Sequence, residues 1–88
     1  MSEWNVYVLR CGDNSLYTGV TTDVERRVNE HNHDDKLAAS YTRSRRPVKL
    51  VYSESYKTRS EALKREITIK KLKKAQKEAL ITPTTRLA

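Results

Sequence analysis

The fold is decided by residues 4–20, which read WNVYVLRCGDNSLYTGV. The two ends of this stretch are rich in apolar, β-branched and aromatic residues, whereas residues 11–15 include Gly, Asp, Asn and Ser, which favour turns. The pattern therefore predicts a β-hairpin with strands over residues 4–10 and 16–20.

The register of this hairpin decides whether Tyr7 and Tyr17 lie on the same face of the sheet. Paired positions in an antiparallel ladder have a constant sum and side chains alternate between faces, so the two tyrosines share a face only if that sum is even. An odd-length loop such as 12–14 pairs Leu9 with Tyr17 and places Tyr7 on the same face. A two-residue turn at 13–14 separates the tyrosines unless a bulge intervenes, and the sequence leaves both registers open.

The length and composition predict one small domain. A chain of 88 residues buries only about 60% of its unfolded surface. Phe is absent, so several of the tyrosines must help to fill the core. We expect a single domain over residues 1–81 and a flexible tail over 82–88. Cys11 is the only cysteine, which excludes an intrachain disulfide, fits a cytoplasmic setting and favours a structural role for this residue.

The charge of the chain is divided unequally between its two parts. Residues 1–35 carry three basic and seven acidic residues, and residues 36–88 carry fifteen basic and four acidic ones, within a net charge of +7. A local excess of this kind indicates a surface that faces a polyanion. No long apolar run is present, so nucleic acid is a better candidate partner than a membrane.

Two capping boxes predict where helices begin. Thr22 and Glu25 start a helix that ends near Asn32, and Thr58 and Glu61 start a second one. In the first helix, Arg27 and His31 lie within about 60° of the apolar stripe, so these polar side chains should point at the interior or at a cleft.

The middle and the end of the chain predict the remaining elements. Residues 33–47 suggest one helical turn followed by a basic loop, and residues 48–56 suggest a third strand whose partner the sequence does not identify. Without Gly or Pro before Pro83, the pattern predicts one helix over residues 59–81, with Ala62, Leu63, Ile67 and Ile69 on its apolar arc and Glu66 between them. A carboxylate in such an arc is costly unless it is paired or bound to metal.

The sequence resembles the GIY-YIG nuclease superfamily over about residues 3–81. The resemblance is carried by residues 6–9 (VYVL), 16–31 (LYTGVTTDVERRVNEH), 41–43 (YTR), 46–52 (RPVKLVY) and 59–66 (RSEALKRE). These residues look like the small single-domain bacterial branch, which is akin to the catalytic domains of Slx-type nucleases and of excinuclease C. The resemblance implies an α+β fold in which helices flank a three-stranded antiparallel sheet, and it suggests that the last helix breaks near Lys73.

The resemblance also implies roles for individual residues. Tyr7 and Tyr17 match the two motif tyrosines, Arg27 and His31 match the helical arginine and the histidine or tyrosine position, and Glu66 matches the metal-binding glutamate. Gly19 matches the motif glycine, which should allow a close backbone approach or a bulge. Many members also carry a late Asn near the site, whereas this chain has none after Asn32.

The implied chemistry is phosphodiester hydrolysis assisted by Mg²⁺ or Mn²⁺. A single Glu suits such an ion, which keeps several waters and takes further oxygens from the phosphate, and Arg27 would bind the phosphate with two N–H groups. Tyr7 is the favoured base or relay to water, with Tyr17 positioning water or phosphate and His31 in support, although the two tyrosines could exchange roles. For Tyr7 to be phenolate at neutral pH, its pKa would have to fall from about 10 to about 7, or by about 4 kcal/mol.

Basic residues and one tyrosine are candidates for backbone contacts to nucleic acid. They are Tyr41, Arg43, Arg45, Arg46, Lys49, Lys70, Lys71, Lys73, Lys74 and Lys77. A Lys-rich helix is often only a solvated face, but the acidic N-terminal segment makes this basicity local.

The leading hypothesis is a divalent-metal-dependent nuclease that acts on DNA in repair, recombination or processing, with RNA as an open alternative substrate. The competing hypothesis is a nucleic-acid-binding module of the same fold that cleaves poorly or not at all, and a basic protein-interaction domain is a weaker third. Because no targeting domain is evident, shape, a protein partner or self-association would supply specificity.

Overall fold

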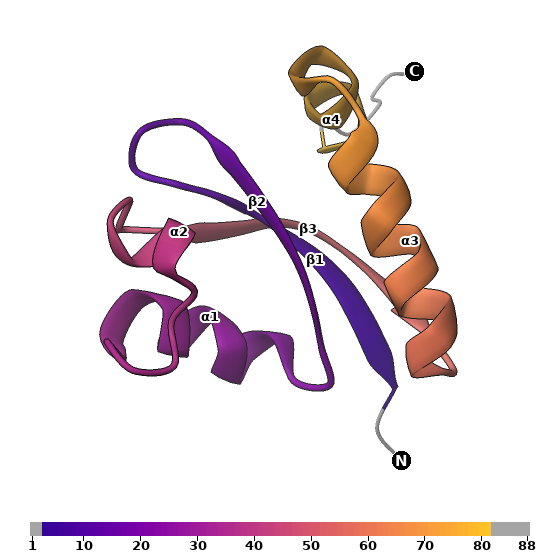
Figure 1. Ribbon diagram of the computed structural model, residues 1–88, viewed down its shortest axis with the longest axis horizontal. Coiled ribbons are helices and arrows are strands. Elements are labelled where there is room, and N and C mark those ends of the chain that lie inside the picture. Colours follow the sequence, from indigo (N-terminus) through magenta and orange to yellow (C-terminus); the bar gives the residue numbers. More distant parts are fainter. Residues whose placement is uncertain (1–2, 82–88) are drawn as a thin grey trace, which may run out of the picture.

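The computed structural model describes residues 3–81 and contains a three-stranded antiparallel sheet with helices on both faces (Figure 1). The elements in chain order are β1 (Trp4–Arg10), β2 (Leu16–Thr21), α1 (Val24–His33), α2 (Ser40–Arg43), β3 (Lys49–Tyr56), α3 (Arg59–Lys71) and α4 (Lys74–Ile81). The strand order is β2-β1-β3, so the partner of the third strand is β1. The expected α+β fold is confirmed, and the predicted tail over 82–88 lies outside the described residues.

The hairpin adopts the register with the even sum. Tyr7 pairs with Gly19 and Leu9 pairs with Tyr17. The Cys11 N–H donates to the Ser15 carbonyl at 2.8 Å, which leaves the three residues 12–14 as the loop. Asn14 closes the loop with a φ of 70°, a left-handed conformation that Asn tolerates better than most residues. The two tyrosines therefore share a face.

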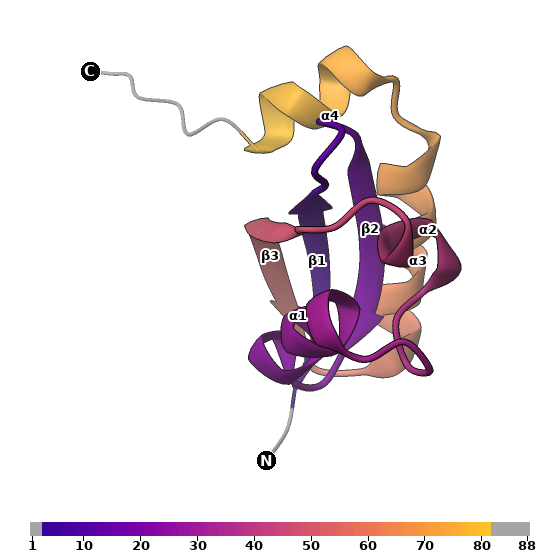
Figure 2. The same cartoon turned by 90° about the vertical axis from the view of Figure 1, so that its left-hand side faces the viewer.

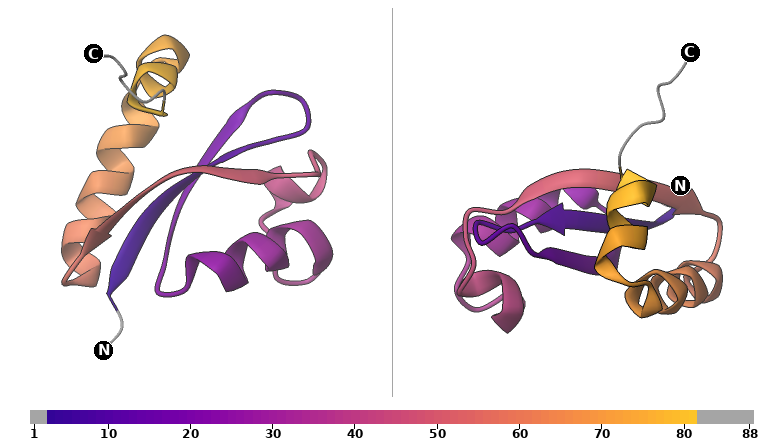
Figure 3. Two further views of the ribbon diagram at one scale, coloured as in Figure 1. Left: turned by 180° about the vertical axis from the view of Figure 1, so that it is seen from behind. Right: turned by 90° about the horizontal axis from the view of Figure 1, so that it is seen from above.

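Alternation along β1 divides the core into two layers. Val6 and Val8 point to one face and pack with Ala62 and Ile69 of α3. Tyr7 points to the other face, in a cluster with Leu9, Cys11 and Val48, against which Val24 and Val28 of α1 pack. Figures 2 and 3 show the sheet between α1 on one side and α3 on the other. Cys11 is buried in this cluster, as its predicted structural role requires.

The first helix begins one residue later than predicted. Asp23, not Thr22, is its N-cap, because the Asp23 carboxylate accepts the N–H of Arg26 at 3.1 Å. The helix also continues to His33. The stripe that carries Arg27 and His31 is unaffected, because these residues keep their spacing along the helix.

The third strand also begins one residue later than predicted, at Lys49. The Asn32 side chain accepts the N–H of Val48 at 2.7 Å and donates to its carbonyl at 2.9 Å. These bonds occupy the backbone groups with which Val48 would join a strand. They also tie the end of α1 to the start of β3.

The predicted single helix over 59–81 is wrong, and the break that the resemblance suggested is present. Leu72 is extended, with φ −68° and ψ 148°, and the Lys73 N–H donates to the Gln76 side chain at 2.9 Å. The break allows Leu80 and Ile81 of α4 to pack on the Val6 and Val8 layer. Without Gly or Pro at the break, periodicity gave no sign of it.

One member of the predicted apolar arc of α3 does not lie in the core. Ile67 is 53% exposed, whereas Ala62 and Ile69 are fully buried. The capping box formed by Thr58 and Glu61 is confirmed by both of its hydrogen bonds.

Glu54 joins β3 to α3. Its carboxylate accepts the Arg65 Nε at 2.9 Å and the Tyr56 hydroxyl at 2.6 Å, and it also accepts the Tyr52 hydroxyl. Burial acts to raise the pKa of Glu54, but these hydrogen bonds outweigh it and lower the pKa to about 2. The network fixes α3 on the sheet. None of the helices in the described part has the length and hydrophobicity that a membrane crossing requires.

Candidate active site

A cleft of about 260 Å³ runs along the β2 edge of the sheet. It is lined by Trp4, Tyr7, Tyr17, Gly19, Val20, Arg27, Arg59, Leu63 and Glu66. A larger hollow of about 540 Å³ lies between α1 and β3, but it is lined by none of the residues predicted to be catalytic. The smaller cleft is therefore the candidate site.

Gly19 leaves room for the Tyr7 ring. Across the ladder, a Cβ on Gly19 would lie 2.6 Å from Cζ of Tyr7 and would also overlap the phenol oxygen. Carbon atoms cannot approach so closely without a shift of the ring or strand. The absence of a side chain at residue 19 thus lets the Tyr7 phenol lie over β2 and reach the cleft, as the predicted close approach requires.

The Tyr7 hydroxyl lies at the head of a buried hydrogen-bonded chain. It is 2.9 Å from Nε2 of His31, and Nδ1 of the same ring is 2.7 Å from the Thr42 hydroxyl. Thr42 donates its single proton to the Ala39 carbonyl at 2.9 Å. The Ala39 N–H also points at Nδ1, at 3.4 Å. Because the contact to Thr42 is much shorter, we assign the ring proton to Nδ1, so that Nε2 accepts the hydrogen bond of Tyr7.

Burial keeps both groups of this pair uncharged. It raises the pKa of Tyr7, with a further contribution from Tyr17, and the Arg27 guanidinium opposes the rise only in part. Burial also lowers the pKa of His31 to about 4, and the nearby charge of Arg27 adds to the effect. At neutral pH Tyr7 is therefore a phenol and His31 a neutral imidazole.

Tyr17 contacts both members of this pair. Its ring centroid lies 6.4 Å from that of Tyr7 and 5.3 Å from that of His31, edge-on to the latter. Its other neighbour is Tyr41, which stacks on it at 5.9 Å. Tyr7 makes the hydrogen bond to His31, so the two tyrosines do not occupy equivalent positions.

Arg27 lines the cleft and is held there by two oxygens. Its guanidinium donates to the Leu37 carbonyl at 2.7 Å and to the Glu30 carboxylate at 3.0 Å. Only 24% of the side chain is exposed. These bonds place a positive charge beside Tyr7 and leave the remaining N–H groups of the fork for a ligand.

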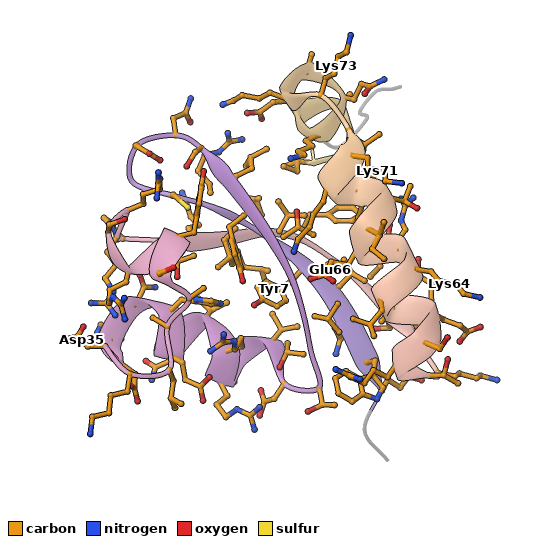
Figure 4. All side chains as sticks on the ribbon, viewed as in Figure 1. Tyr7, Asp35, Lys64, Glu66, Lys71 and Lys73 are labelled. Carbon is orange, nitrogen blue, oxygen red and sulfur yellow. The ribbon has the colours of Figure 1, made fainter. Side chains whose placement is uncertain are left out.

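Glu66 reaches the same cleft from the opposite side of the sheet. Figure 4 shows Tyr7 and Glu66 pointing toward one another, while Lys64 and Lys71 lie on the outer side of α3. The Glu66 side chain is only 17% exposed, and its carboxylate pairs with Lys70 at 3.4 Å. This pair explains how the chain tolerates a half-buried carboxylate on an apolar helix face.

Arg27, His31 and Glu66 do not all approach the cleft from one face of the sheet. Arg27 and His31 do approach the Tyr7 face from α1, but α3 packs on the other face, against Val6 and Val8. Glu66 lines the cleft along the edge strand β2, beside Gly19.

The donor set suits a hard divalent cation held by one carboxylate. No group of three or more His, Cys, Asp or Glu side chains gathers within residues 3–81, so the described part has no closed protein cage. Mg²⁺ and Mn²⁺ need none when a phosphate supplies the other oxygens. Glu66 is the carboxylate that would hold such an ion in the cleft.

The predicted nucleic-acid-binding arginines are largely engaged within the molecule. Arg43 donates to the Asp35 carbonyl, Arg46 pairs with the Asp35 carboxylate at 2.8 Å, and Arg45 pairs with Asp13 at 3.1 Å. Their positive charge is thus partly balanced by the acidic N-terminal segment. Arg45 also lies 3.9 Å from the ring centroid of Tyr41, so the stack on Tyr17 ends in a cation.

The predicted lysines are divided between the cleft and the outer surface. Lys70 pairs with Glu66, and Lys74 donates to the Asn14 carbonyl at 2.9 Å and pairs with Glu78 at 3.4 Å. Lys71 and Lys73 are exposed. Lys74 therefore helps to hold α4 beside the hairpin.

Sequence reasoning missed three residues of this site. Thr42 is fully buried against His31, and Trp4 and Arg59 line the cleft. Thr42 lies eleven residues after His31, so no helical or strand periodicity in the sequence connects the two residues. Arg59 lies one helical turn before Leu63 and two turns before Glu66. A helical wheel centred on Glu66 would therefore have placed Arg59 on the same face.

The chain is similar to known proteins over most of its length. Residues 3–79 match the family model of the GIY-YIG catalytic domain. A UPF0213 protein of Desulfotalea psychrophila is 54% identical over 78 residues, which cover 89% of this chain and 70% of that protein. A UPF0213 protein of Halobacterium salinarum is 57% identical over 76 residues, which cover 86% and 96% of the two chains.

Two solution NMR structures share the fold. One is a UPF0213 protein from Bacillus halodurans, with 41% identity, a TM-score of 0.56, and coverage of 92% of this chain and 83% of that one. The other is a protein from E. faecalis, with 42% identity, a TM-score of 0.60, and coverage of 91% and 84%. Together with the family model, these similarities show that the chain belongs to the GIY-YIG family, with the small UPF0213 proteins among its relatives.

Proposed function

We propose that this protein is a divalent-metal-dependent nuclease that hydrolyses phosphodiester bonds of DNA. One observation supports this most strongly: Tyr7, Tyr17, Arg27 and Glu66 line one cleft, and His31 is hydrogen-bonded to Tyr7 behind it. A proton acceptor, a phosphate-binding cation and a carboxylate for a metal are the three things that this hydrolysis requires.

Tyr7 and His31 would handle the proton of the attacking water as a pair. Because Tyr7 is a phenol at neutral pH, it cannot serve as a free phenolate in the metal-free protein. It can take the proton of water as it gives its own proton to Nε2 of His31, which lies 2.9 Å from the Tyr7 hydroxyl. Of the roles considered for Tyr7, this favours the relay, and Tyr17 would orient the water or the phosphate.

Arg27 would bind the phosphate and balance the charge that develops on its oxygens. A guanidinium has five N–H donors, and the bonds to Glu30 and Leu37 are made through one nitrogen, Nη1. The other N–H groups can bind a phosphate while these bonds hold the side chain in place.

The metal would be Mg²⁺ or Mn²⁺, held by Glu66. When bound, such an ion withdraws charge from a phosphate oxygen and eases departure of the leaving alkoxide. Lys70, the present partner of Glu66, is 53% exposed and free to move into solvent. The role of the chain is to hold the carboxylate in the cleft beside Tyr7.

The substrate would be recognised through its backbone and its shape. Tyr41, Arg43, Arg45, Arg46, Lys70 and Lys74 remain our candidates for nucleic-acid contacts, and DNA repair, recombination or processing remains the proposed setting. A protein partner or self-association would add specificity.

A second candidate function is a nucleic-acid-binding module that cleaves poorly. It is favoured by the internal pair of Glu66 with Lys70, which a metal ion would have to displace. Such a module would use the same cleft for binding alone.

A cleavage assay separates the two functions. Labelled linear, nicked and branched DNA, and RNA of matched sequence, would be incubated with the purified protein and Mg²⁺, Mn²⁺ or EDTA. We expect metal-dependent cleavage that is lost in Glu66→Ala and Arg27→Ala. Binding without cleavage above the level of a double variant that carries both Glu66→Ala and Arg27→Ala would support the binding module and reject the nuclease.

A further inference from the structure

The cleft contains a second arginine that the catalytic set does not use. Arg59 is the first residue of α3 and lines the cleft together with Trp4, Leu63 and Glu66. Its guanidinium carbon lies 5.6 Å from the ring centroid of Trp4. The Trp4 ring is itself packed against the Val6 and Val8 layer, so it gives Arg59 a fixed surface to lie on.

Arg59 differs from the other arginines near the cleft in having no anionic partner. Arg27 pairs with Glu30, Arg45 with Asp13, and Arg46 with Asp35. Within residues 3–81, Arg59 makes its contact with Trp4 and no ion pair, and it is exposed. A contact over an aromatic ring restrains a guanidinium but leaves its N–H groups available to an anion.

The spacing along α3 places Arg59 away from the reacting centre. Seven residues separate Arg59 from Glu66, and at about 1.5 Å per residue their Cα atoms are about 10 Å apart along the helix axis. Side chains on a helix lean toward its N-terminus, so the Arg59 side chain extends away from Glu66. This interval is longer than one phosphate group, so a cation at Arg59 would reach a different phosphate from the one held near Glu66.

We propose that Arg59, held over Trp4, binds a phosphate that flanks the scissile phosphate on the same nucleic-acid strand. This inference rests on the proposed function and adds that the bound strand extends beyond the scissile phosphate. The substrate is a strand that continues beyond the scissile bond on the Trp4 side, and a single phosphodiester does not use this subsite. Arg59 is a binding residue in this proposal, and Trp4 is the residue that positions it.

The proposal is tested by binding, which does not depend on catalysis. A fluorescent DNA oligonucleotide would be titrated with the Glu66→Gln protein in EDTA at several salt concentrations. Adding Arg59→Gln should weaken binding several-fold at low salt and reduce the slope of log K against log salt by about one, the value for one lost phosphate contact. Arg59→Lys should keep most of the slope, because it keeps the charge.

Lys57→Ala provides the matched control, because Lys57 is an exposed cation two residues earlier that does not line the cleft. It should leave the slope nearly unchanged. Trp4→Leu, which keeps an apolar side chain against the core, should weaken binding less than Arg59→Gln does. An unchanged slope in Arg59→Gln, or equal losses in Arg59→Gln and Lys57→Ala, would overturn the proposal.

A small substrate separates this proposal from the proposed function. Arg59→Gln should reduce cleavage of a DNA oligonucleotide more than it reduces hydrolysis of bis(p-nitrophenyl) phosphate, which has one phosphodiester. Equal reductions of the two reactions would place Arg59 in the reacting centre and contradict the flanking subsite. If the wild type hydrolyses neither substrate, the nuclease fails, and the binding comparison still decides the role of Arg59.

Discussion

The Tyr7 hydroxyl lies 2.9 Å from Nε2 of a fully buried His31. We assign Tyr7 as the donor on the basis of Thr42, whose own proton goes to the Ala39 carbonyl and whose oxygen is then the acceptor for Nδ1–H. The pair is therefore set to move a proton from the phenol to the imidazole. It is not an ion pair at rest, because burial favours the uncharged form of both groups.

The ring of His31 should stay neutral down to a pH of about 4, with its proton on Nδ1. The ¹⁵N shifts of the ring, followed by NMR between pH 8 and pH 3, give both the pKa and the tautomer. Thr42→Val removes the acceptor for Nδ1–H and should increase the share of the other tautomer, whereas Thr42→Ser should retain the wild-type shifts. A proton on Nε2 in the wild type would show that the bond to Tyr7 runs in the opposite direction.

The same histidine should make stability depend on pH between about 6.5 and 4. The folded-state pKa of about 4 lies below the ordinary value of 6.5, so the unfolded chain binds more protons in this interval. The free energy of unfolding should therefore fall as the pH is lowered from 6.5 to 4, and this contribution should level off below 4. Urea denaturation at each pH measures it, and His31→Gln should be flatter over this interval than the wild type.

Glu54 should make the stability of the protein depend on pH in a more acidic range than His31 does. Its folded-state pKa of about 2 lies below the ordinary value of 4.5, so the stability that it provides is fully present above 4.5 and is lost as the pH falls toward 2. Denaturation curves of Glu54→Gln should show a smaller loss across this interval. Glu61→Gln, at an exposed carboxylate of α3, is the control. Parallel pH profiles for the wild type and Glu54→Gln would mean that the Arg65 network does not persist in solution.

Gly19→Ala should destabilise the protein by about 1–3 kcal/mol, the usual cost of overpacking, and should displace the Tyr7 ring. The new Cβ would lie 2.6 Å from Cζ of Tyr7. Gly12→Ala is a matched control, because its Cβ would meet the Arg46 carbonyl oxygen at 2.7 Å, outside the cleft. A double-mutant cycle with Tyr7→Leu should show strong coupling for Gly19→Ala and little for Gly12→Ala. Additive effects of Gly19→Ala and Tyr7→Leu would contradict the close approach.

The sequence was informative where the signal is local. The turn residues 11–15 predicted the hairpin, but the register depended on whether residues 12–14 or 13–14 form the loop. Thr58 and Glu61 predicted a helix start correctly because both partners of the capping box lie within one turn. The box at Thr22 failed because Asp23, one residue later, offers a carboxylate to the same end of the helix.

Features that depend on distant contacts were not predictable from the residues alone. The break at Leu72 is stabilised by packing of Leu80 and Ile81 on the sheet, which no local pattern encodes. Likewise, Thr42 shows its role only when α2 comes against α1. Glu66 reaches the cleft along the β2 edge because α3 packs on the face of the sheet opposite to Tyr7. The resemblance identified Glu66 as a site residue but did not indicate from which side it approaches.

Single-turnover cleavage of labelled branched DNA with Mn²⁺, compared between the wild type and Tyr7→Phe, tests most directly whether the cleft is a nuclease site. Phe keeps the ring over Gly19 but removes the hydroxyl that, in the proposed mechanism, relays the proton to His31. We expect wild-type cleavage and a loss of about 10²–10⁴-fold in Tyr7→Phe, the usual contribution of a positioned acid or base, with DNA binding unchanged. Equal rates for the two proteins, or no metal-dependent cleavage by the wild type, would contradict the assignment.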